Sequence, residues 1–293
     1  MAVQTVRVPV TKSSRRNRPV RIHRGGPAVA GLALCLGALT ACGGSSGPSA
    51  GDPATPPAAP TTDSARTPAS AKDDAAPLDG KVVVIDPGHN GGNADHPSEI
   101  NKQVKIGNGS KACDTTGTET KAGYAEHAFT WDVSKRLAKL LRARGAKVTL
   151  TREDDKSVGP CITERAAVGN ELKADAAISI HADGAAASGH GFHIIEPISI
   201  GRNADMVSGS TKLGKALRDA YHEGTGIPYS NYLGKNAIDR RDDLGGLNMS
   251  KVPKVFIECG NMQNKSDAAK LSSSSFRQRI ADSLAKGFET YLS

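Results

Sequence analysis

The sequence predicts an α/β fold: a single three-layer domain with a mixed, mostly parallel central sheet flanked by helices. Along residues 79–293, short apolar runs rich in β-branched residues alternate with longer segments in which apolar residues recur every three or four positions. This alternation of strand and helix patterns is typical of layered α/β domains. The strand-like runs are apolar on both faces, as expected where helices cover both sides of a sheet. Chemical sites in such folds gather at the carboxyl ends of the strands.

The 293-residue chain divides into three parts by composition. Residues 1–41 carry seven basic and no acidic residues and end in an uncharged apolar run, which is too short to cross a bilayer comfortably and is typical of a signal peptide. Residues 42–78 are rich in Gly, Ser, Ala, Pro and Thr, a composition that cannot bury a core and predicts a disordered tether. We therefore expect one folded domain, at residues 79–293.

The leader ends in Leu39-Thr-Ala-Cys42-Gly, which resembles the lipobox of bacterial lipoproteins, in which the cysteine is acylated. We expect lipidation at Cys42, which would hold the exported domain at the outer face of the plasma membrane. The alternative is ordinary cleavage, which would leave the protein periplasmic or secreted. Ser14-Arg-Arg16 hints at twin-arginine export, but apolar residues do not follow the pair, so the export route stays open.

The net charge of +8 belongs to the leader rather than to the folded part. Seven of the 38 basic residues precede Cys42, and the remainder nearly balances the 30 acidic residues. Aromatic residues make up only 4% of the chain, and the folded part has no basic cluster. We therefore expect no nucleic-acid partner, and we expect a monomer.

The first strand and the first helix bracket a long polar stretch. The strand is the run Val82–Ile85, which Asp86-Pro-Gly88 ends so that His89 lies in a turn. Residues 93–120 lack helical periodicity and predict an extended loop or weak hairpin beside this strand end. A helix follows at residues 124–144, stopped by Gly145, and its apolar stripe consists of Phe129, Val133, Leu137, Leu140 and Leu141. Glu126 lies in the first turn of this helix and points toward the sheet.

The remaining elements continue the alternation. Further strands are predicted at residues 146–152, 176–183, 191–197 and 252–260, and further helices at residues 162–172, 205–223 and 276–291. His181 and Glu258 lie near the ends of two of these strands. In the helix at residues 162–172 we expect Arg165 and Glu171 to face solvent.

Four chemically active side chains therefore fall at element ends: His89, Glu126, His181 and Glu258. Two imidazoles and one carboxylate suit a catalytic zinc ion, which takes three protein ligands and keeps one position for water. Each residue alone also has a structural interpretation, because strand-end histidines are often hydrogen bonded and a glutamate is stabilised at a helix N-terminus. Glu258 is harder to explain in this way, since a carboxylate within an apolar strand is costly to bury without a partner.

Together these residues resemble the zinc-dependent N-acetylmuramoyl-L-alanine amidases of the amidase-3 type, and most of all the mycobacterial amidases that lack an inhibitory helix over the site. The resemblance covers about residues 81–293. The matching pieces, in the family's order, are Ile85-Asp-Pro-Gly-His-Asn-Gly-Gly92, Glu126, Ser179-Ile-His-Ala-Asp183 with Gly191-Phe192, Arg241-Asp-Asp-Leu244 and Pro253-Lys-Val-Phe-Ile-Glu-Cys-Gly260 with Asn264. Cys259 and Asn261-Met-Gln depart from the small or apolar residues usual in the family, which leaves fine substrate preference open.

The resemblance implies hydrolysis of the amide between N-acetylmuramic acid and L-alanine, in polymeric peptidoglycan or in released muropeptides. It also implies that His89, Glu126 and His181 hold one zinc ion per chain and that Glu258 is the general base. Arg241 would meet a peptide carboxylate, with a surface salt bridge as the alternative. Two other functions remain open: a non-catalytic lipoprotein that binds the cell wall, and a zinc peptidase or deacetylase.

Of the five cysteines, Cys35 leaves with the leader and three remain in the folded part, in an oxidising compartment. Cys113 and Cys161 lie in loops that flank the first helix, and we expect a disulfide between them, worth about 4 kcal/mol in the chain-entropy model. Strand alternation turns Cys259 away from the face that Glu258 uses, so we expect a buried thiol. The bystander histidines expected in solvent are His96, His127, His190 and His222. His193 lies in a strand near the site, and for it contact with substrate stays open as an alternative to a bystander role.

Overall fold

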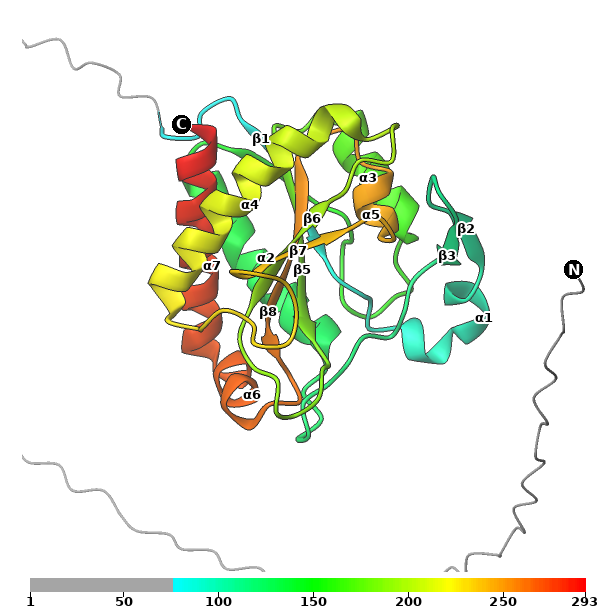
Figure 1. The fold of residues 1–293 in the computed structure, drawn as a ribbon, viewed down its shortest axis with the longest axis vertical. Helices are drawn as coiled ribbons and strands as arrows, with labels where there is room; N and C mark the ends of the chain where they lie inside the picture. Colours follow the sequence, from blue (N-terminus) through cyan, green and yellow to red (C-terminus); the bar gives the residue numbers. More distant parts are fainter. Residues whose placement is uncertain (1–75) are drawn as a thin grey trace, which may run out of the picture. The chain divides into compact units, whose positions relative to one another are not determined.

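The computed structural model describes residues 76–293. The expected signal peptide, the lipidation site Cys42 and nearly all of the tether lie outside the described residues. The described part forms three layers (Figure 1), with a six-stranded sheet between two layers of helices. The sheet consists of β1 (Val82–Pro87), β4 (Lys147–Leu150), β5 (Ala176–Asp183), β6 (His193–Pro197), β7 (Ile238–Arg241) and β8 (Lys254–Asn261).

The order of strands across the sheet is β4-β1-β5-β8-β6-β7. All neighbouring strands are parallel except β6 and β8, which are antiparallel. This arrangement confirms the prediction of a mixed, mostly parallel sheet. The edge strand β7 was not predicted, because its sequence Ile-Asp-Arg-Arg has a single apolar residue.

One face of the sheet is covered by three long helices, and the other face by two short ones. The three long helices are α2 (Glu126–Ala143), α4 (Ala204–Thr225) and α7 (Ser274–Leu292). The two short helices are α3 (Ile162–Glu171) and α5 (Gly245–Asn248), and α6 (Lys265–Ser272) packs beside α7 and β8. The predicted helices are all present, whereas α5 and α6 were missed because they are too short for a periodic pattern.

The main hydrophobic core lies between the sheet and the long helices. Alternate strand residues such as Val83, Ile85 and Val255 are fully buried there against the predicted stripe of α2, in which Phe129 and Leu137 are also fully buried. Burying a side chain of this size stabilises a fold by about 1.5–3 kcal/mol. The opposite sheet face has only a small apolar cluster, formed by Val84, Ala174, Ala177 and Val252. Beyond that cluster this face becomes polar, and the polar part holds the site.

Residues 93–115 leave the sheet and return to it. The excursion contains the short helices η1 (Asn93–Asp95) and α1 (Pro97–Ile100) and a separate two-stranded hairpin of β2 (Gln103–Lys105) and β3 (Ser110–Ala112). The prediction of a weak hairpin is thus confirmed for part of the stretch. Figure 1 shows this excursion set apart from the main sheet, on the side of α3 and α5. Among residues 76–293, no helix combines the length and apolar character needed to cross a bilayer.

The prediction that Arg165 faces solvent is wrong. Its side chain is only 4% exposed, and it lies under the turn that follows β1, where its guanidinium meets Asp86 and Asp114. The sequence pattern of α3 placed Arg165 on the polar side of the helix, but that side is covered by the excursion. Glu171, at the end of α3, is exposed as expected.

Candidate metal centre and active site

Three elements bring His89, Glu126 and His181 together. His89 follows β1 in a left-handed conformation at φ 59°, Glu126 is the first residue of α2, and His181 lies near the end of β5. The Nε2 atom of His89 lies 3.2 Å from Oε2 of Glu126, and Nδ1 of His181 lies 3.0 Å from Oε1 of the same carboxylate. One donor atom from each residue falls within 4.8 Å of the others.

The donor set fits a zinc ion. Two ligands of a tetrahedral zinc ion lie roughly 3.3 Å apart when each is about 2.0–2.1 Å from the metal. Each histidine nitrogen lies near that separation from one oxygen of Glu126, at 3.2 Å from Oε2 for His89 and 3.0 Å from Oε1 for His181, and one donor atom from each residue lies within 4.8 Å of the other two. Two imidazoles and a carboxylate are also the donor types of catalytic zinc sites with three protein ligands. These residues would therefore hold the ion, in agreement with the sequence-based expectation.

Backbone groups fix the carboxylate of Glu126. The amide of Thr118 donates to Oε2 at 2.9 Å, and the amide of Ala182 donates to Oε1 at 3.1 Å. Burial alone would raise the pKa of Glu126, but His89 and His181 outweigh it and hold the pKa well below its ordinary value. Glu126 is therefore an ionised ligand with its orientation already set.

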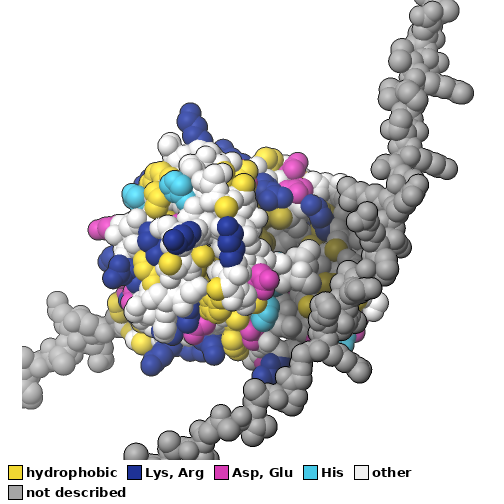
Figure 2. All heavy atoms as spheres, turned by 90° about the horizontal axis from the view of Figure 1, so that it is seen from below, with side chains coloured by type: hydrophobic (Ala, Val, Ile, Leu, Met, Phe, Trp, Pro, Cys, Tyr) yellow, Lys and Arg dark blue, Asp and Glu magenta, His cyan; other side chains and the backbone are white. Residues whose placement is uncertain are grey.

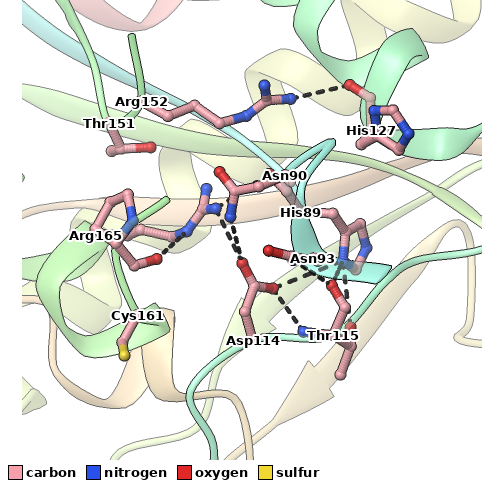
Figure 3. Close-up of polar contacts among 12 residues, drawn as sticks. His89, Asn90, Asn93, Asp114, Thr115, His127, Thr151, Arg152, Cys161 and Arg165 are labelled. Carbon is pink, nitrogen blue, oxygen red and sulfur yellow. Dashed lines mark hydrogen bonds and ion pairs between the residues drawn. The ribbon is translucent and has the colours of Figure 1, made fainter. Parts of the chain in front are cut away.

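His89 is held from its other ring nitrogen. Nδ1 lies 3.0 Å from the carbonyl oxygen of Thr115 and 3.7 Å from Oδ1 of Asp114, as Figure 3 shows. Burial would lower the pKa of His89, but the carboxylates of Glu126 and Asp114 raise it to about 10. With Nδ1 engaged, Nε2 is the nitrogen that faces the other two ligands.

A buried network of charges supports the turn that carries His89. The carboxylate of Asp86 lies 2.9 Å from Nη1 of Arg165 and 3.0 Å from Nζ of Lys254, and it also accepts bonds from the hydroxyls of Thr151 and Ser179. Arg165 also reaches Asp114 at 3.0 Å (Figure 3). Sequence analysis missed this network. The polar residues that interrupt β1, β5 and β8 at Asp86, Ser179 and Lys254 were the available signal.

Glu258 lies beside the ligands because of strand register. It is the partner of His181 across β5 and β8, and of His193 across β8 and β6, so the three side chains form a row on one sheet face. Burial, Glu126 and Asp183 raise the pKa of Glu258 well above its ordinary value. Its Oε2 atom is buried without a hydrogen-bond partner. A raised pKa and a position in the site are typical of a general acid or base.

His193 is buried rather than open to substrate. Its side chain is 1% exposed and borders none of the described cavities, and its Nδ1 has no hydrogen-bond partner. Its ring meets that of Tyr232 edge to face, at 6.0 Å between centroids. His193 is therefore neither solvated nor on the cavity wall, and its strand register places it next to Glu258 in the row across β6.

A cavity of about 290 Å³ opens onto His89, His181 and Glu258. It continues over Phe256 and Ile195 to a charged rim that contains Lys111, Arg241 and Asp243. Arg241 makes a two-bonded ion pair with Asp243, at 2.8 Å for each bond, and remains partly exposed. This site therefore offers one apolar wall and one rim of mixed charge to a ligand.

The cysteine prediction is confirmed where it can be checked. Cys113 and Cys161 form a disulfide, and Cys259 is a fully buried free thiol. Of the bystander histidines, His127 differs from expectation, because it is partly buried and lies 2.9 Å from Asp155. On the face drawn in Figure 2, Lys and Arg side chains are interspersed with acidic, neutral and apolar ones.

Comparisons with known proteins agree with this geometry. The sequence model of the family Amidase_3, described as N-acetylmuramoyl-L-alanine amidase, matches residues 83–290. The chain is 41% identical over 221 residues to N-acetylmuramoyl-L-alanine amidase Rv3717 of Mycobacterium tuberculosis, which covers 74% of this chain and 88% of the relative. The crystal structure of the amidase Ami1 from Mycobacterium smegmatis matches with a TM-score of 0.70 and 40% identity, over 73% of this chain and 98% of that chain. Ami1 from Mycobacterium abscessus matches with the same score and identity, over 74% of this chain and 100% of that chain.

Proposed function

Since the chain belongs to the Amidase_3 family of N-acetylmuramoyl-L-alanine amidases, we propose that it hydrolyses the amide bond between N-acetylmuramic acid and the L-alanine of the stem peptide in peptidoglycan. The observation that carries the proposal is the convergence of His89, Glu126 and His181 beside Glu258, where all four residues line one cavity. A zinc ion held by the three ligands would supply Lewis acidity toward the scissile carbonyl and toward a water.

Within this mechanism Glu258 moves the proton. Its carboxylate takes a proton from the attacking water and returns it to the leaving amine of L-alanine, a role worth about 10²–10⁴ in rate. Burial beside other acids favours a proton on this carboxylate, which suits the return step. A bound zinc ion would favour the ionised form of Glu258, which suits removal of a proton from the water. His89, Glu126 and His181 act as positioning ligands and stay in place throughout.

The test is the variant Glu258→Gln, assayed on purified peptidoglycan and on released muropeptides. We expect zinc content to equal that of the unaltered protein and release of stem peptides to fall at least 10²-fold. Glu223→Gln, an exposed position at the end of α4, is the matched control and should keep full activity. If Glu258→Gln releases stem peptides at the normal rate, the proposed role is wrong.

Product masses separate this proposal from its alternatives. Free amino groups on L-alanine with intact N-acetylmuramic acid require cleavage of the amide. A zinc peptidase would instead yield shortened stem peptides, and a deacetylase would release acetate. A non-catalytic wall-binding protein would give no new products and would bind peptidoglycan equally well with Gln at position 258.

Arg241 is proposed to bind a carboxylate of the stem peptide. It lies on the rim of the cavity, partly exposed, and its partner Asp243 holds the guanidinium toward the opening. Arginine suits this role because its planar group binds carboxylates through two parallel bonds.

The location of the protein at the cell envelope is proposed on two grounds, the substrate and the leader sequence. We infer that Cys42 is acylated and that the monomeric domain acts from the outer face of the plasma membrane. The variant Cys42→Ala should then move from the membrane fraction to the soluble fraction of cells. Metabolic labelling with a palmitate analogue should mark the unaltered protein and spare the variant.

A further inference from the structure

The disulfide and the ligand His89 are connected by one short segment, residues 113–115. Cys113 forms the disulfide, and two residues later the carbonyl oxygen of Thr115 lies 3.0 Å from Nδ1 of His89. The hydroxyl of Thr115 lies 3.2 Å from the same nitrogen, and the carboxylate of Asp114 lies 3.7 Å from it. Within residues 76–293, the polar partners of this nitrogen come from Asp114 and Thr115.

Helix α3 is the body to which this segment is attached. Cys161 is the N-cap residue of α3, and the amide of Ile162 donates to the carbonyl of Cys113 at 2.8 Å. One turn further along α3, Arg165 donates to Asp114 at 3.0 Å and to the carbonyl of His89 at 3.1 Å. A covalent bond and an ion pair thus fasten the same segment to the same helix. Figure 3 shows the ion pair of Arg165 with Asp114 beside the turn that holds His89.

The hairpin before the segment has few strong contacts with the main domain. The segment is the return arm of the excursion, whose strands β2 and β3 pair only with each other. An isolated two-stranded hairpin is marginally stable in water. The polar contacts of its tip with the main domain, such as Lys111 with Asp243, are solvent-exposed. Exposed ion pairs contribute little to stability. Within the first turn after β1, Asn90 also donates to Asp114 at 2.8 Å and Asn93 donates to the carbonyl of Thr115 at 2.7 Å. The disulfide and the buried pair of Arg165 with Asp114 are the connections of the segment to α3.

We propose that the Cys113–Cys161 disulfide, together with Asp114 and Arg165, is a positioning device for the metal ligand His89. Breaking it frees the carbonyl of Thr115 and the carboxylate of Asp114 to move, so His89 loses the partners that fix its ring. The inference rests on the metal site proposed above. Partners of ligating histidines typically change metal affinity by about 10- to 100-fold when they are substituted.

The first experiment measures zinc affinity on metal-free full-length protein by competition with a chromogenic chelator. We expect Asp114→Asn and the double variant Cys113→Ser with Cys161→Ser to bind zinc about 10- to 100-fold more weakly. Asp219→Asn is the matched control, since Asp219 is also paired with an arginine but lies on α4 and is exposed. Its zinc affinity should be unchanged.

The second experiment breaks the disulfide in the folded, unaltered protein. A phosphine reductant supplies two electrons to the sulfur–sulfur bond; two thiols form with two protons, and the phosphine becomes a phosphine oxide with oxygen from water. We expect the same loss of zinc affinity as in the double variant, at a temperature where circular dichroism shows a native fold. The double variant itself should not respond to the phosphine. Reduction of the unaltered protein therefore tests the proposal even if the double variant does not fold.

A spectroscopic measurement distinguishes a change in the position of His89 from a general loss of stability. With Co²⁺ in place of zinc, the visible absorption bands report ligand geometry, and we expect them to change in Asp114→Asn but not in Asp219→Asn. Zinc affinities within about twofold of the unaltered protein in Asp114→Asn and in the reduced protein overturn the inference. Failure of the amidase proposal would be recognised separately. An unaltered protein that binds zinc but releases no stem peptide would contradict the amidase proposal, and the zinc affinities of the variants could still be compared.

Discussion

Asp86 shows how a single buried carboxylate can support a site without being one of the proposed metal ligands. Burial would raise its pKa, but Lys254, Arg165 and the hydroxyls of Ser179 and Thr151 hold the pKa well below its ordinary value. A lowered pKa means that the ionised form stabilises the folded state. That stability is present above the unfolded-state pKa of about 3.9, and it is lost as the pH falls toward the lower folded-state value.

Replacing Asp86 by Asn should therefore destabilise the domain at neutral pH by about 3–5 kcal/mol, because two buried cations lose their partner. The difference in unfolding free energy from the unaltered protein should shrink as the pH falls below about 4, because the unfolded chain then takes up a proton at Asp86 that the folded protein, with its lower pKa, binds only at a lower pH. Urea unfolding at pH 7 and pH 3 measures both. Asp219→Asn should change stability by less than about 0.5 kcal/mol. Equal urea midpoints for Asp86→Asn and the unaltered protein at pH 7 would contradict this account.

Arg241 gives a prediction about substrate rather than stability. We expect Arg241→Ala to raise KM for muropeptides about 10-fold with kcat nearly unchanged, because a binding contact present in both ground and transition states is lost. Arg240→Ala is the matched control, since the neighbouring arginine pairs with Glu196 instead and borders a different groove. A muropeptide with amidated carboxylates should abolish the difference between Arg241→Ala and the unaltered protein. A fall in kcat at constant KM would show that Arg241 has another role.

At the scale of elements, the loop before α2 packs its backbone against the ligands. Gly117 has a φ of +78°, and a Cβ atom there would lie 2.8 Å from Oε2 of Glu126 and 2.8 Å from the ring of His89. Gly123, in the same loop, has a φ of +81° with no atom within 4 Å of such a Cβ. The two glycines share their backbone conformation and differ in what a side chain would meet.

Replacing each glycine by alanine should therefore distinguish the effect of backbone strain from the effect of a steric clash with Glu126 and His89. Both variants should lose about 1 kcal/mol of stability, because a left-handed residue with a side chain is strained. Only Gly117→Ala should also lose zinc affinity, by at least 10-fold, since its methyl group displaces two ligands. Calorimetric titration measures the zinc affinity of each variant, and urea unfolding measures its stability. Equal zinc affinities in the two variants would show that the loop can yield without moving the ligands.

The elements that sequence predicts well are those with long periodic patterns. The stripe of α2 and the apolar runs of β1, β5 and β8 identified these elements correctly, since burial on one or both faces leaves a repeating pattern. The sequence singled out the four candidate site residues because each lies at or near the end of such an element, and the structure brings them together. Arg165 was misplaced for the complementary reason: its partners Asp86 and Asp114 come from distant elements, and no local pattern records them. Short elements such as β7 and α5 also leave too little pattern to detect.

At the scale of the whole molecule, the proposed ion should stabilise the fold. A ligand that binds only the folded state adds about 2.7 kcal/mol when its free concentration is 100 times Kd. We therefore expect removal of zinc by a chelator to lower the melting temperature, and calcium to give no recovery. Glu126→Ala should melt at the same temperature with and without zinc. If the unaltered protein has the same melting temperature with and without zinc, the proposed metal centre is wrong.

The three proposed ligands come from the end of one strand, the start of a helix and the middle of the sheet, with no two of them adjacent in the chain. In a newly made polypeptide these three side chains are therefore far apart until the layers close. We therefore expect the chain to bind the proposed ion only when the fold is completed. If export delivers the chain unfolded, the ion must be acquired from the supply outside the membrane, and the nascent enzyme stays inert toward the wall until then.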